Sequence, residues 1–266
     1  MDHEAVGRYW DENAEAWTEL VRAGYDHSHD GLNTPAFLEM LPEIDGLSGL
    51  DAGCGEGHNT RLLAERGARM TGIGISRTFI RHAKEAEDAH RLGIDYRLTS
   101  AVDLPFHEAG FDFVTAFMSL MDIPETERVL AEVLRVLEPG GFFQFSITHP
   151  CFDTPHRRNL RDESGYTYAI EVGDYFVGRE GEVKEWLFSA APPDVKVGMT
   201  PFRIPVFVRT LSSWLNRLVE AGFLLERFDE PYPSDEAIRA RTSLQDAQVV
   251  ANFLHVRTRK PATTEG

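Results

Sequence analysis

Hydrophobic positions along the chain change from a helical spacing near the start to an alternation of short apolar runs and helical stretches. Between residues 9 and 21 the apolar side chains recur every three or four positions, which predicts an amphipathic helix bearing Trp10, Ala14, Trp17 and Val21. Beyond Leu50, runs of strand length follow one another. The run Phe111–Phe117 is almost continuously apolar, as expected for a strand buried on both faces of a parallel sheet.

Strands and helices are predicted in alternation through the rest of the chain. The first predicted strand ends at Leu50, and the other six cover 69–75, 94–98, 111–117, 142–147, 223–228 and 249–256. One helix is predicted over 59–66, and a second from Ser76, its N-cap, to about Gly93. A third is terminated by Pro139-Gly140-Gly141, and a fourth begins at Thr210. This alternation indicates an α/β fold with a doubly wound, mostly parallel seven-stranded sheet. Ligands of such sheets bind beyond the carboxyl ends of the strands.

One span does not fit a plain strand-to-helix connection. Residues 151–208 follow the fifth predicted strand and are too long for a simple loop and too aromatic for a linker. We expect this aromatic-rich insertion to cover the substrate. The predicted organisation is therefore an N-terminal helical segment over the cofactor (1–46), a cofactor-binding half of the sheet (47–150), the insertion (151–208), a C-terminal helix with the last strands (209–258) and a flexible tail (259–266).

The loop after the first predicted strand carries the clearest chemical signal. Residues 50–57 read Leu-Asp-Ala-Gly-Cys-Gly-Glu-Gly, so that an acidic residue precedes glycines at every second position. Glycine allows sharp turns and lets a bulky ligand lie against bare backbone, as a nucleotide-like cofactor requires. The dinucleotide fingerprint needs its third glycine at position 58, where this chain has His58. This spacing disfavours a nucleotide-dependent oxidoreductase.

Composition and charge narrow the classes of partner. The 266 residues carry a formal net charge of −16, which repels phosphate backbones and anionic lipids, so neither nucleic acid nor a membrane is expected as a partner. No apolar run is long enough to cross a bilayer, and the first residues lack the pattern of a signal peptide. With Cys54 and Cys151 as the only cysteines, we expect reduced thiols and a cytoplasmic location. Association between copies is left open.

Four segments in order resemble the class I S-adenosylmethionine-dependent methyltransferases. Leu50–Gly57 matches the acidic-x-Gly-x-Gly-x-Gly motif of the family, and the other matching segments are Val102–Phe106, Leu134–Gly141 and Ala221–Phe223. The resemblance implies a Rossmann-like methyltransferase fold with S-adenosylmethionine as cofactor. Within the class, Leu120–Pro124 and His149–Phe152 are similar to bacterial antibiotic-tailoring N-methyltransferases, including those of lincosamide pathways.

Two positions depart from the family pattern. Where the family ends its second strand with an acidic residue that grips the ribose hydroxyls, this chain has Gly74, and where an Asp often faces the adenine amino group it has Ser100. Losing a charged acceptor forfeits about 1.5–3 kcal/mol of hydrogen bonding unless another group replaces it. Ser76 is one candidate replacement, and weakened cofactor binding is expected.

The resemblance implies two sets of site residues. The cofactor would contact Asp51, with hydrogen bonds to loop amides, Gly53 and Gly55 beneath the ligand, and Cys54, Ser76, Ser100, Ala101, Val102, Ala116 and Phe117. Gly57 is assigned to close helix packing. The acceptor would contact Tyr9, Trp17, Asn33, Met121, His149 and Tyr175. Among these sets, Phe117, His149 and Tyr9 are expected to be catalytic, His149 as a proton acceptor. An alternative role for His149 is bracing the insertion, and for Trp17 packing on the core.

The sequence therefore implies methyl transfer from S-adenosylmethionine to a nitrogen of a small molecule, such as a secondary-metabolite intermediate. The alternatives are methyl transfer to oxygen, or a protein that binds the cofactor without turnover. No metal is expected, because the histidines at 27 and 29 do not share a helix face and no fourth ligand is apparent beside Asp30.

Overall fold

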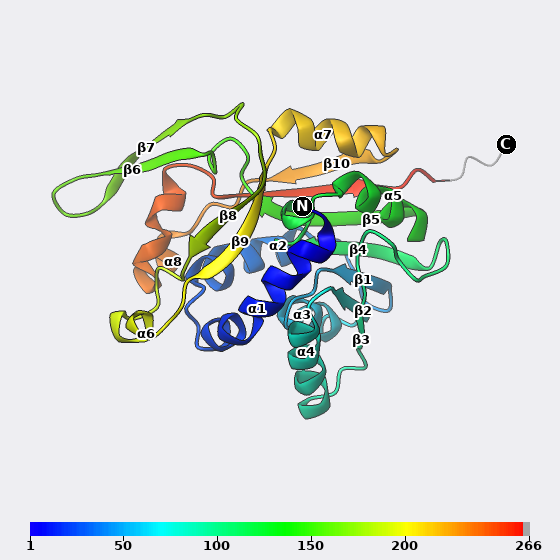
Figure 1. Cartoon of the computed structure of the whole chain (residues 1–266). Coiled ribbons are helices and arrows are strands. Elements are labelled where there is room, and N and C mark those ends of the chain that lie inside the picture. Colours follow the sequence, from blue (N-terminus) through cyan, green and yellow to red (C-terminus); the bar gives the residue numbers. More distant parts are fainter. Residues whose placement is uncertain (263–266) are drawn as a thin grey trace.

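A computed structural model describes residues 1–262 and has one central sheet covered on both faces (Figure 1). The sheet follows the order β10-β11-β5-β4-β1-β2-β3. Its strands are β1 (Ser48–Ala52), β2 (Arg69–Gly74), β3 (Asp95–Leu98), β4 (Phe111–Phe117), β5 (Leu137–Thr148), β10 (Leu224–Asp229) and β11 (Phe253–Arg259). Pairs from β3 to β5 are parallel, and β11 is antiparallel to β5 and to β10. The predicted seven-stranded, mostly parallel fold is confirmed.

Helices pack on each face of this sheet because each carries one apolar stripe. The helices are α1 (His3–Arg22), α2 (Thr34–Met40), α3 (His58–Glu65), α4 (Arg77–Ala89), α5 (Thr126–Val136), α6 (Pro193–Val197), α7 (Leu211–Glu220) and α8 (Asp235–Ala240). Side chains of α5 and α7 form one core with β1, β4, β5 and β11, including Val133, Trp214 and Leu218. The opposite core joins α2, α3 and α4 to the sheet. Among the described residues, no helix is long and apolar enough to span a bilayer.

Several predicted boundaries move, each for a local reason. The helix predicted to reach Gly93 ends at Ala89, because Glu87 Oε1 accepts the amide hydrogens of Leu92 and Gly93. Pro139-Gly140-Gly141 lies within β5 because Gly140 and Gly141 exchange hydrogen bonds with Lys260 after the last strand. That last strand begins at 253 rather than 249, since a 3₁₀ helix occupies Thr242–Gln248. The N-caps predicted at Ser76 and Thr210 are both present.

The span 151–208 forms two antiparallel hairpins. The first pairs β6 (His156–Arg161) with β7 (Thr167–Gly173), and the second pairs β8 (Arg179–Trp186) with β9 (Phe202–Val208). In Figure 1 the second hairpin lies alongside α1. Trp17 of α1 contacts the rings of Trp186, Phe188 and Phe202 at centroid distances of 5.3, 4.9 and 5.0 Å. The insertion is thus anchored to the N-terminal helix by an aromatic cluster.

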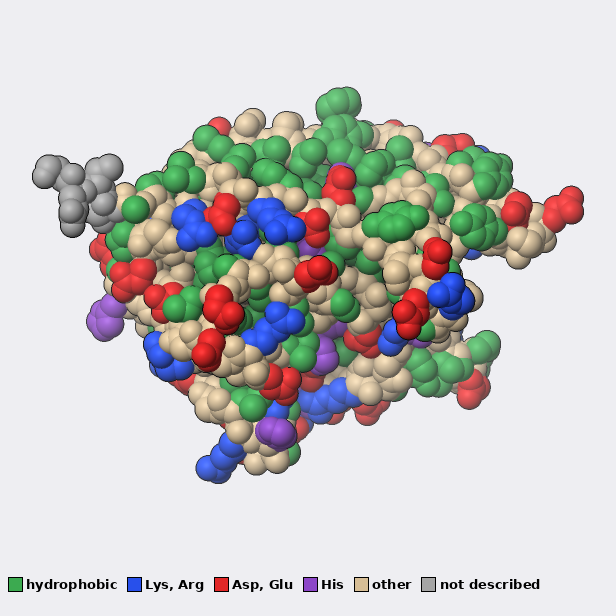
Figure 2. Space-filling view, turned by 180° about the vertical axis from the view of Figure 1, so that it is seen from behind, with side chains coloured by type: hydrophobic (Ala, Val, Ile, Leu, Met, Phe, Trp, Pro, Cys, Tyr) green, Lys and Arg blue, Asp and Glu red, His purple; other side chains and the backbone are tan. Residues whose placement is uncertain are grey.

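The surface carries charged side chains of both signs. On the face shown in Figure 2, Lys and Arg side chains are interspersed with Asp and Glu side chains. Arg257 and Arg259, for example, both pair with Glu226. The predicted tail 259–266 begins too early, because Arg259 is the last residue of β11, and residues 263–266 of that tail lie outside the described residues. Cys54 and Cys151 are both free thiols, as expected.

Candidate active site

The glycine loop between β1 and α3 has a shape that only glycine adopts readily. Gly53, Gly55 and Gly57 have φ angles of 82°, 56° and 91°, in the left-handed region. A Cβ at Gly53 would lie 2.4 Å from Ser119 Cβ, and one at Gly57 would lie 2.5 Å from the Tyr96 hydroxyl. At Gly55 it would meet no atom within 4 Å. The loop therefore offers bare, open backbone at Gly55, while Gly53 allows the close approach of Ser119, and the predicted place of Gly53 beneath the ligand stays a prediction.

Asp51 holds the loop together from below. Its side chain is buried, and its two carboxylate oxygens accept hydrogen bonds from the hydroxyls of Thr60 at 2.6 Å and Thr115 at 3.0 Å. Burial raises the pKa of Asp51 to about 6. The expected bonds from Asp51 to loop amides are therefore wrong: the carboxylate ties β1 to α3 and β4, and the loop amides of Gly53 and Cys54 donate instead to the Ile73 carbonyl.

At the end of β2, an acidic side chain arrives from another element. Asp11 of α1 accepts hydrogen bonds from the Ser76 hydroxyl at 2.7 Å and the Thr78 amide at 2.8 Å. Ser76 Oγ in turn accepts from the Phe79 amide and caps α4. A Cβ at Gly74 would meet Ile80 Cδ1 at 3.4 Å, so the position has room for a side chain. A carboxylate thus lies beside the segment where this chain lacks the acidic residue of the family pattern.

The remaining predicted cofactor residues line the neighbouring strand ends. Ala101, Val102 and Ala116 are buried in the core, so only their backbones can face a ligand. Ser100 Oγ accepts the Val102 amide and forms a local turn. Cys54 packs into the opposite core, and burial raises the pKa of its thiol, which keeps it protonated. Their contacts with a cofactor stay predictions.

Phe117 closes β4 with an aromatic cluster. Its ring is buried and lies edge to face with Phe37 at 5.1 Å and with His29 at 5.0 Å. The next residue, Met118, has a φ of 52°, a strained value for a non-glycine residue that turns the chain toward the glycine loop. His29 also lies 5.3 Å from the ring of His58, the first residue of α3. Phe117 thus lies among aromatic rings at the carboxyl edge of the sheet, and its catalytic role stays a prediction.

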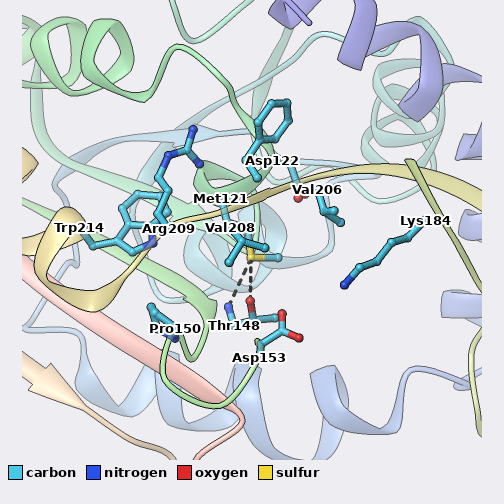
Figure 3. A pocket seen from close by; sticks show the side chains of 11 residues that line it. Met121, Asp122, Thr148, Pro150, Asp153, Lys184, Val206, Val208, Arg209 and Trp214 are labelled. Atoms are coloured by element: carbon cyan, nitrogen blue, oxygen red, sulfur yellow. Dashed lines mark hydrogen bonds between the residues drawn. The ribbon is translucent and has the colours of Figure 1, made fainter. Parts of the chain in front are cut away.

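A cavity of about 80 Å³ opens between this edge and the β8–β9 hairpin (Figure 3). Its lining residues come from the ends of β4 and β5, the second hairpin and α7: Met121, Asp122, Thr148, Pro150, Asp153, Lys184, Val206, Phe207, Val208, Arg209 and Trp214. Figure 3 shows Lys184 extending inward from the hairpin toward the side of Thr148 and Asp153. A second cavity of about 300 Å³ lies at the amino end of β5, and its lining includes Pro42, Gly141 and Arg259. Ligands of such sheets bind at the opposite edge, so the smaller cavity is the candidate site.

Charged groups of both signs line this cavity. Burial, opposed by Arg209 and reinforced by the nearby Asp153, raises the pKa of Asp122 to about 8. Arg209 is itself buried, and its Nη2 donates to the Ile123 and Pro124 carbonyls while Nε and Nη1 have no hydrogen-bond partner among the described residues. The guanidinium lies over the rings of Phe207 and Trp214. A carboxyl that is neutral at pH 7 thus lies in a cavity that a cation could enter.

His149 does not occupy the predicted position. Thr148 and Pro150 line the cavity, but the buried ring of His149 contacts Glu230 through Nε2 at 2.7 Å, and its Nδ1 accepts the Cys151 amide at 3.2 Å. Both ring nitrogens are engaged, which leaves none to take a proton from an acceptor in this cavity. The bracing role is the one that the contacts support.

Asn33 is also placed differently from the prediction. It is 1% exposed, and its Oδ1 accepts from the Ser146 hydroxyl and from His255 Nε2. Burial lowers the pKa of His255 to about 4, so this ring stays neutral. A π-helical turn, His29–Asn33, directs the Asn33 side chain into the core rather than toward a ligand.

The other predicted acceptor residues separate into two groups. Met121 lines the cavity, with its sulfur 3.3 Å from the Thr148 amide (Figure 3). Tyr9 lies under the guanidinium of Arg203, and Trp17 packs in the aromatic cluster with the insertion. The Tyr175 hydroxyl accepts the Leu211 amide at the start of α7. The structure therefore brings only Met121 of this set to the cavity wall.

Sequence reasoning missed the cavity residues of the insertion, and also Asp153 and Asp11. The pattern Val206-Phe207-Val208-Arg209 precedes the Thr210 cap and reads as an ordinary strand. A basic residue at the end of an apolar strand, next to a helix cap, was the available signal for Arg209. Nothing in the spacing of Asp11 or Lys184 indicated which element each would meet.

The fold and the glycine loop define a class: α/β proteins with a five-strand parallel core, an antiparallel last strand and a glycine-rich turn after the first strand. Residues 50–145 match the family model described as a methyltransferase domain. The solved structure of an S-adenosylmethionine-dependent methyltransferase from Mesorhizobium loti is 28% identical and superposes with a TM-score of 0.69 over 85% of this chain and 96% of that one.

Curated relatives point to the same family. A ubiquinone biosynthesis O-methyltransferase of Coxiella burnetii is 28% identical over 52% of this chain and 55% of its own length. The methyltransferase GfsG of Streptomyces halstedii is 30% identical over 51% of this chain and 55% of its own length. This chain spans about half the length of these relatives. Residues 50–145 thus resemble a methyltransferase domain, and the chain is similar in fold to S-adenosylmethionine-dependent methyltransferases.

Proposed function

We propose that this protein transfers a methyl group from S-adenosylmethionine to a nitrogen of a small molecule. The observation that carries the proposal is the cavity at the ends of β4 and β5, where Asp122 and Asp153 lie near each other beside the donor-binding edge. Its volume of about 80 Å³ is small beside the several hundred Å³ of a drug-sized ligand site. It suits the reacting end of an acceptor.

The residues present fit the donor at the other side of this edge. Open backbone at Gly55, with the room at Gly74 and the carboxylate of Asp11, provides a surface for a nucleoside and its charged tail. S-adenosylmethionine supplies an already activated methyl group when it is bound. The protein's task is then to align the acceptor and exclude water, to which the rings of Phe117 and Phe37 contribute.

Asp122 supports nitrogen as the acceptor atom. A neutral carboxyl in a buried cavity regains its charge when a cation enters, because an opposite charge lowers its pKa. An ammonium group would therefore be attracted to Asp122 and Asp153, and either carboxylate could then take the proton that the amine must lose before methylation. This replaces His149, whose ring nitrogens are engaged elsewhere.

The resemblance of Leu120–Pro124 and His149–Phe152 to antibiotic-tailoring N-methyltransferases supports an acceptor from bacterial secondary metabolism. Methyl transfer to oxygen is the second candidate, because the Coxiella burnetii relative is named an O-methyltransferase. Asp122 in its ionised form, which predominates above pH 8, would be the base for a hydroxyl.

A matched set of acceptors tests the proposal. We would assay transfer of labelled methyl from S-adenosylmethionine to small cyclic amines and to the alcohols and phenols of the same size. We expect methylated amines, and a loss of at least roughly 100-fold in turnover for Asp122→Asn, the order expected for a proton-transfer group, with S-adenosylhomocysteine affinity unchanged. Transfer to the hydroxyl compounds alone would favour the O-methyl alternative. Cofactor binding without transfer to either set would favour a non-catalytic protein.

A further inference from the structure

Two histidines and an aspartate from distant parts of the chain meet beside Phe117. His29 and Asp30 begin the π-helical turn, and His58 is the first residue after the glycine loop. His29 Nδ1 lies 3.1 Å from Asp30 Oδ1, and one potential donor atom from each of the three residues lies within 4.8 Å of the other two. Because His58 lies 29 positions after His29, their spacing in the sequence did not indicate that they meet.

The spacing is that of ligands on one ion. Two donors about 2.1 Å from a metal, at angles near 90–110°, lie roughly 3.0–3.4 Å apart, and the His29–Asp30 distance falls in this range. Two imidazoles with one carboxylate are a donor set for first-row divalent metals, and three protein ligands leave coordination positions open.

Neighbouring side chains hold His29 in place. Its ring packs edge to face on Phe117 at 5.0 Å, and its Nε2 lies 3.2 Å from Asn59 Nδ2 and 3.2 Å from Thr34 Oγ1. The imidazole is 16% exposed and the Asp30 side chain 26% exposed, so the cluster is partly shielded yet reachable from solvent. An imidazole restrained by packing and hydrogen bonds loses little freedom when it binds a metal.

We propose that His29, Asp30 and His58 bind one divalent transition-metal ion of the zinc type, leaving at least one coordination position for water or for an oxygen or nitrogen of a bound molecule. This site lies where the glycine loop meets Phe117. The proposal is the same whether the methyl group goes to a nitrogen or to an oxygen. The alternative is a metal-free hydrogen bond between His29 and Asp30.

The test is a titration of the full chain, purified without a histidine tag and stripped with EDTA, with ZnCl2 in a calorimeter. We expect one Zn²⁺ per chain with a micromolar or tighter Kd, weakened roughly 100-fold or more by His29→Ala or His58→Ala and about tenfold by Asp30→Asn. His27→Ala is the matched control, because its ring bonds Ser243 and stands outside the cluster.

Two outcomes would overturn the proposal. One is the absence of stoichiometric Zn²⁺ uptake by the wild-type chain, and the other is uptake that neither His29→Ala nor His58→Ala changes. The exposed position of His58 makes its variant a safe one for folding, and circular dichroism of each variant checks that it is folded. The visible absorption of the Co²⁺-loaded wild-type protein is a second readout: bands typical of a nitrogen-ligated ion support the site, and a spectrum of hydrated Co²⁺ contradicts it.

Discussion

The glycine loop and the cavity beneath the second hairpin, the two sides of the proposed site, are built in different ways. At the loop, the backbone of Gly55 is bare and open, and side chains such as Asp51 only hold the loop in shape. At the cavity, the wall is made of side chains from the segment after β4, the end of β5, the insertion and α7, with the ionisable groups of Asp122 and Arg209 among them. The first is a short continuous motif, and the second is assembled from distant segments. The donor site can therefore be read from sequence, and the acceptor site only from structure.

The largest effect is expected where the backbone itself is the binding surface. In Gly55→Val the side chain would fill the open space, and we expect S-adenosylhomocysteine affinity to fall by at least roughly 1,000-fold, about 4 kcal/mol. Calorimetry measures this affinity. Gly46→Val is the matched control, because Gly46 has a φ of 75° and also meets no atom within 4 Å, but lies before β1. Both variants should lose about 1–2 kcal/mol of stability. Equal S-adenosylhomocysteine affinity in the two variants would contradict the claim that the backbone at Gly55 forms the donor-binding surface.

A smaller gain is expected at the end of β2. Gly74→Asp would add a charged acceptor in the family's usual place, and we expect about tenfold tighter S-adenosylhomocysteine binding, equivalent to about 1.5 kcal/mol. Gly74→Ala controls for the added Cβ, whose nearest neighbours would be Ile80 Cδ1 at 3.4 Å, Ile80 Cγ1 at 3.7 Å and Cys54 Sγ at 3.9 Å. If Asp and Ala variants bind alike, Asp11 and Ser76 already fill that role, or the alignment of β2 with the family is wrong.

The cavity side of the comparison can be tested through pH. The pKa of Asp122 is raised to about 8 in the folded chain, against 3.8 ordinarily. Below pH 3.8 the carboxyl is protonated in both states and costs nothing. As pH rises toward 8, the unfolded state ionises while the folded state resists, so wild-type stability falls. Asp122→Asn lacks this loss and should be the more stable protein at pH 8 by at least about 1 kcal/mol, or roughly 2–4 °C in Tm.

Thermal melts of both proteins from pH 4.5 to 8.5 give the Tm difference directly. A difference that does not grow with pH would mean that the Asp122 carboxyl is not desolvated in the folded chain, and the electrostatic argument for an amine acceptor would lose its basis.

The smallest catalytic effect is expected at His149. Its nitrogens bond Glu230 and Cys151, so His149→Gln should change turnover by no more than about threefold while lowering stability by about 1–2 kcal/mol through lost hydrogen bonds. Steady-state assays with denaturant melts separate the two quantities. A loss in turnover above tenfold with retained folding would restore His149 as a catalytic group.

The contrast between β4 and His149 shows what the sequence can and cannot predict. The strand pattern was predicted because burial imposes a regular spacing, as in β4, which matches its predicted limits of Phe111 and Phe117. We predicted that His149 lies in the site because it follows β5. Its two neighbours, Thr148 and Pro150, do line the cavity, but side chains alternate along an extended chain, so the ring of His149 points away from it. One residue of register decides the matter.

Asn33 was misplaced for a related reason, and the contacts of His29 were not predicted. Both lie in a π-helical turn, whose wider spacing changes which side chains face the core. The turn buries Asn33 against Ser146 and brings His29 onto Phe117. Such contacts depend on tertiary packing, and no local pattern predicts them.

The most direct test of the division between a backbone-formed donor site and a side-chain-formed acceptor site is a crystal structure with S-adenosylhomocysteine. We predict the ligand against Gly55 and the end of β2, with its sulfur facing Phe117 and the cavity of Met121 and Asp122. A ligand bound instead in the larger cavity between Pro42 and Arg259, or a crevice at Gly55 closed by side chains, would contradict the account.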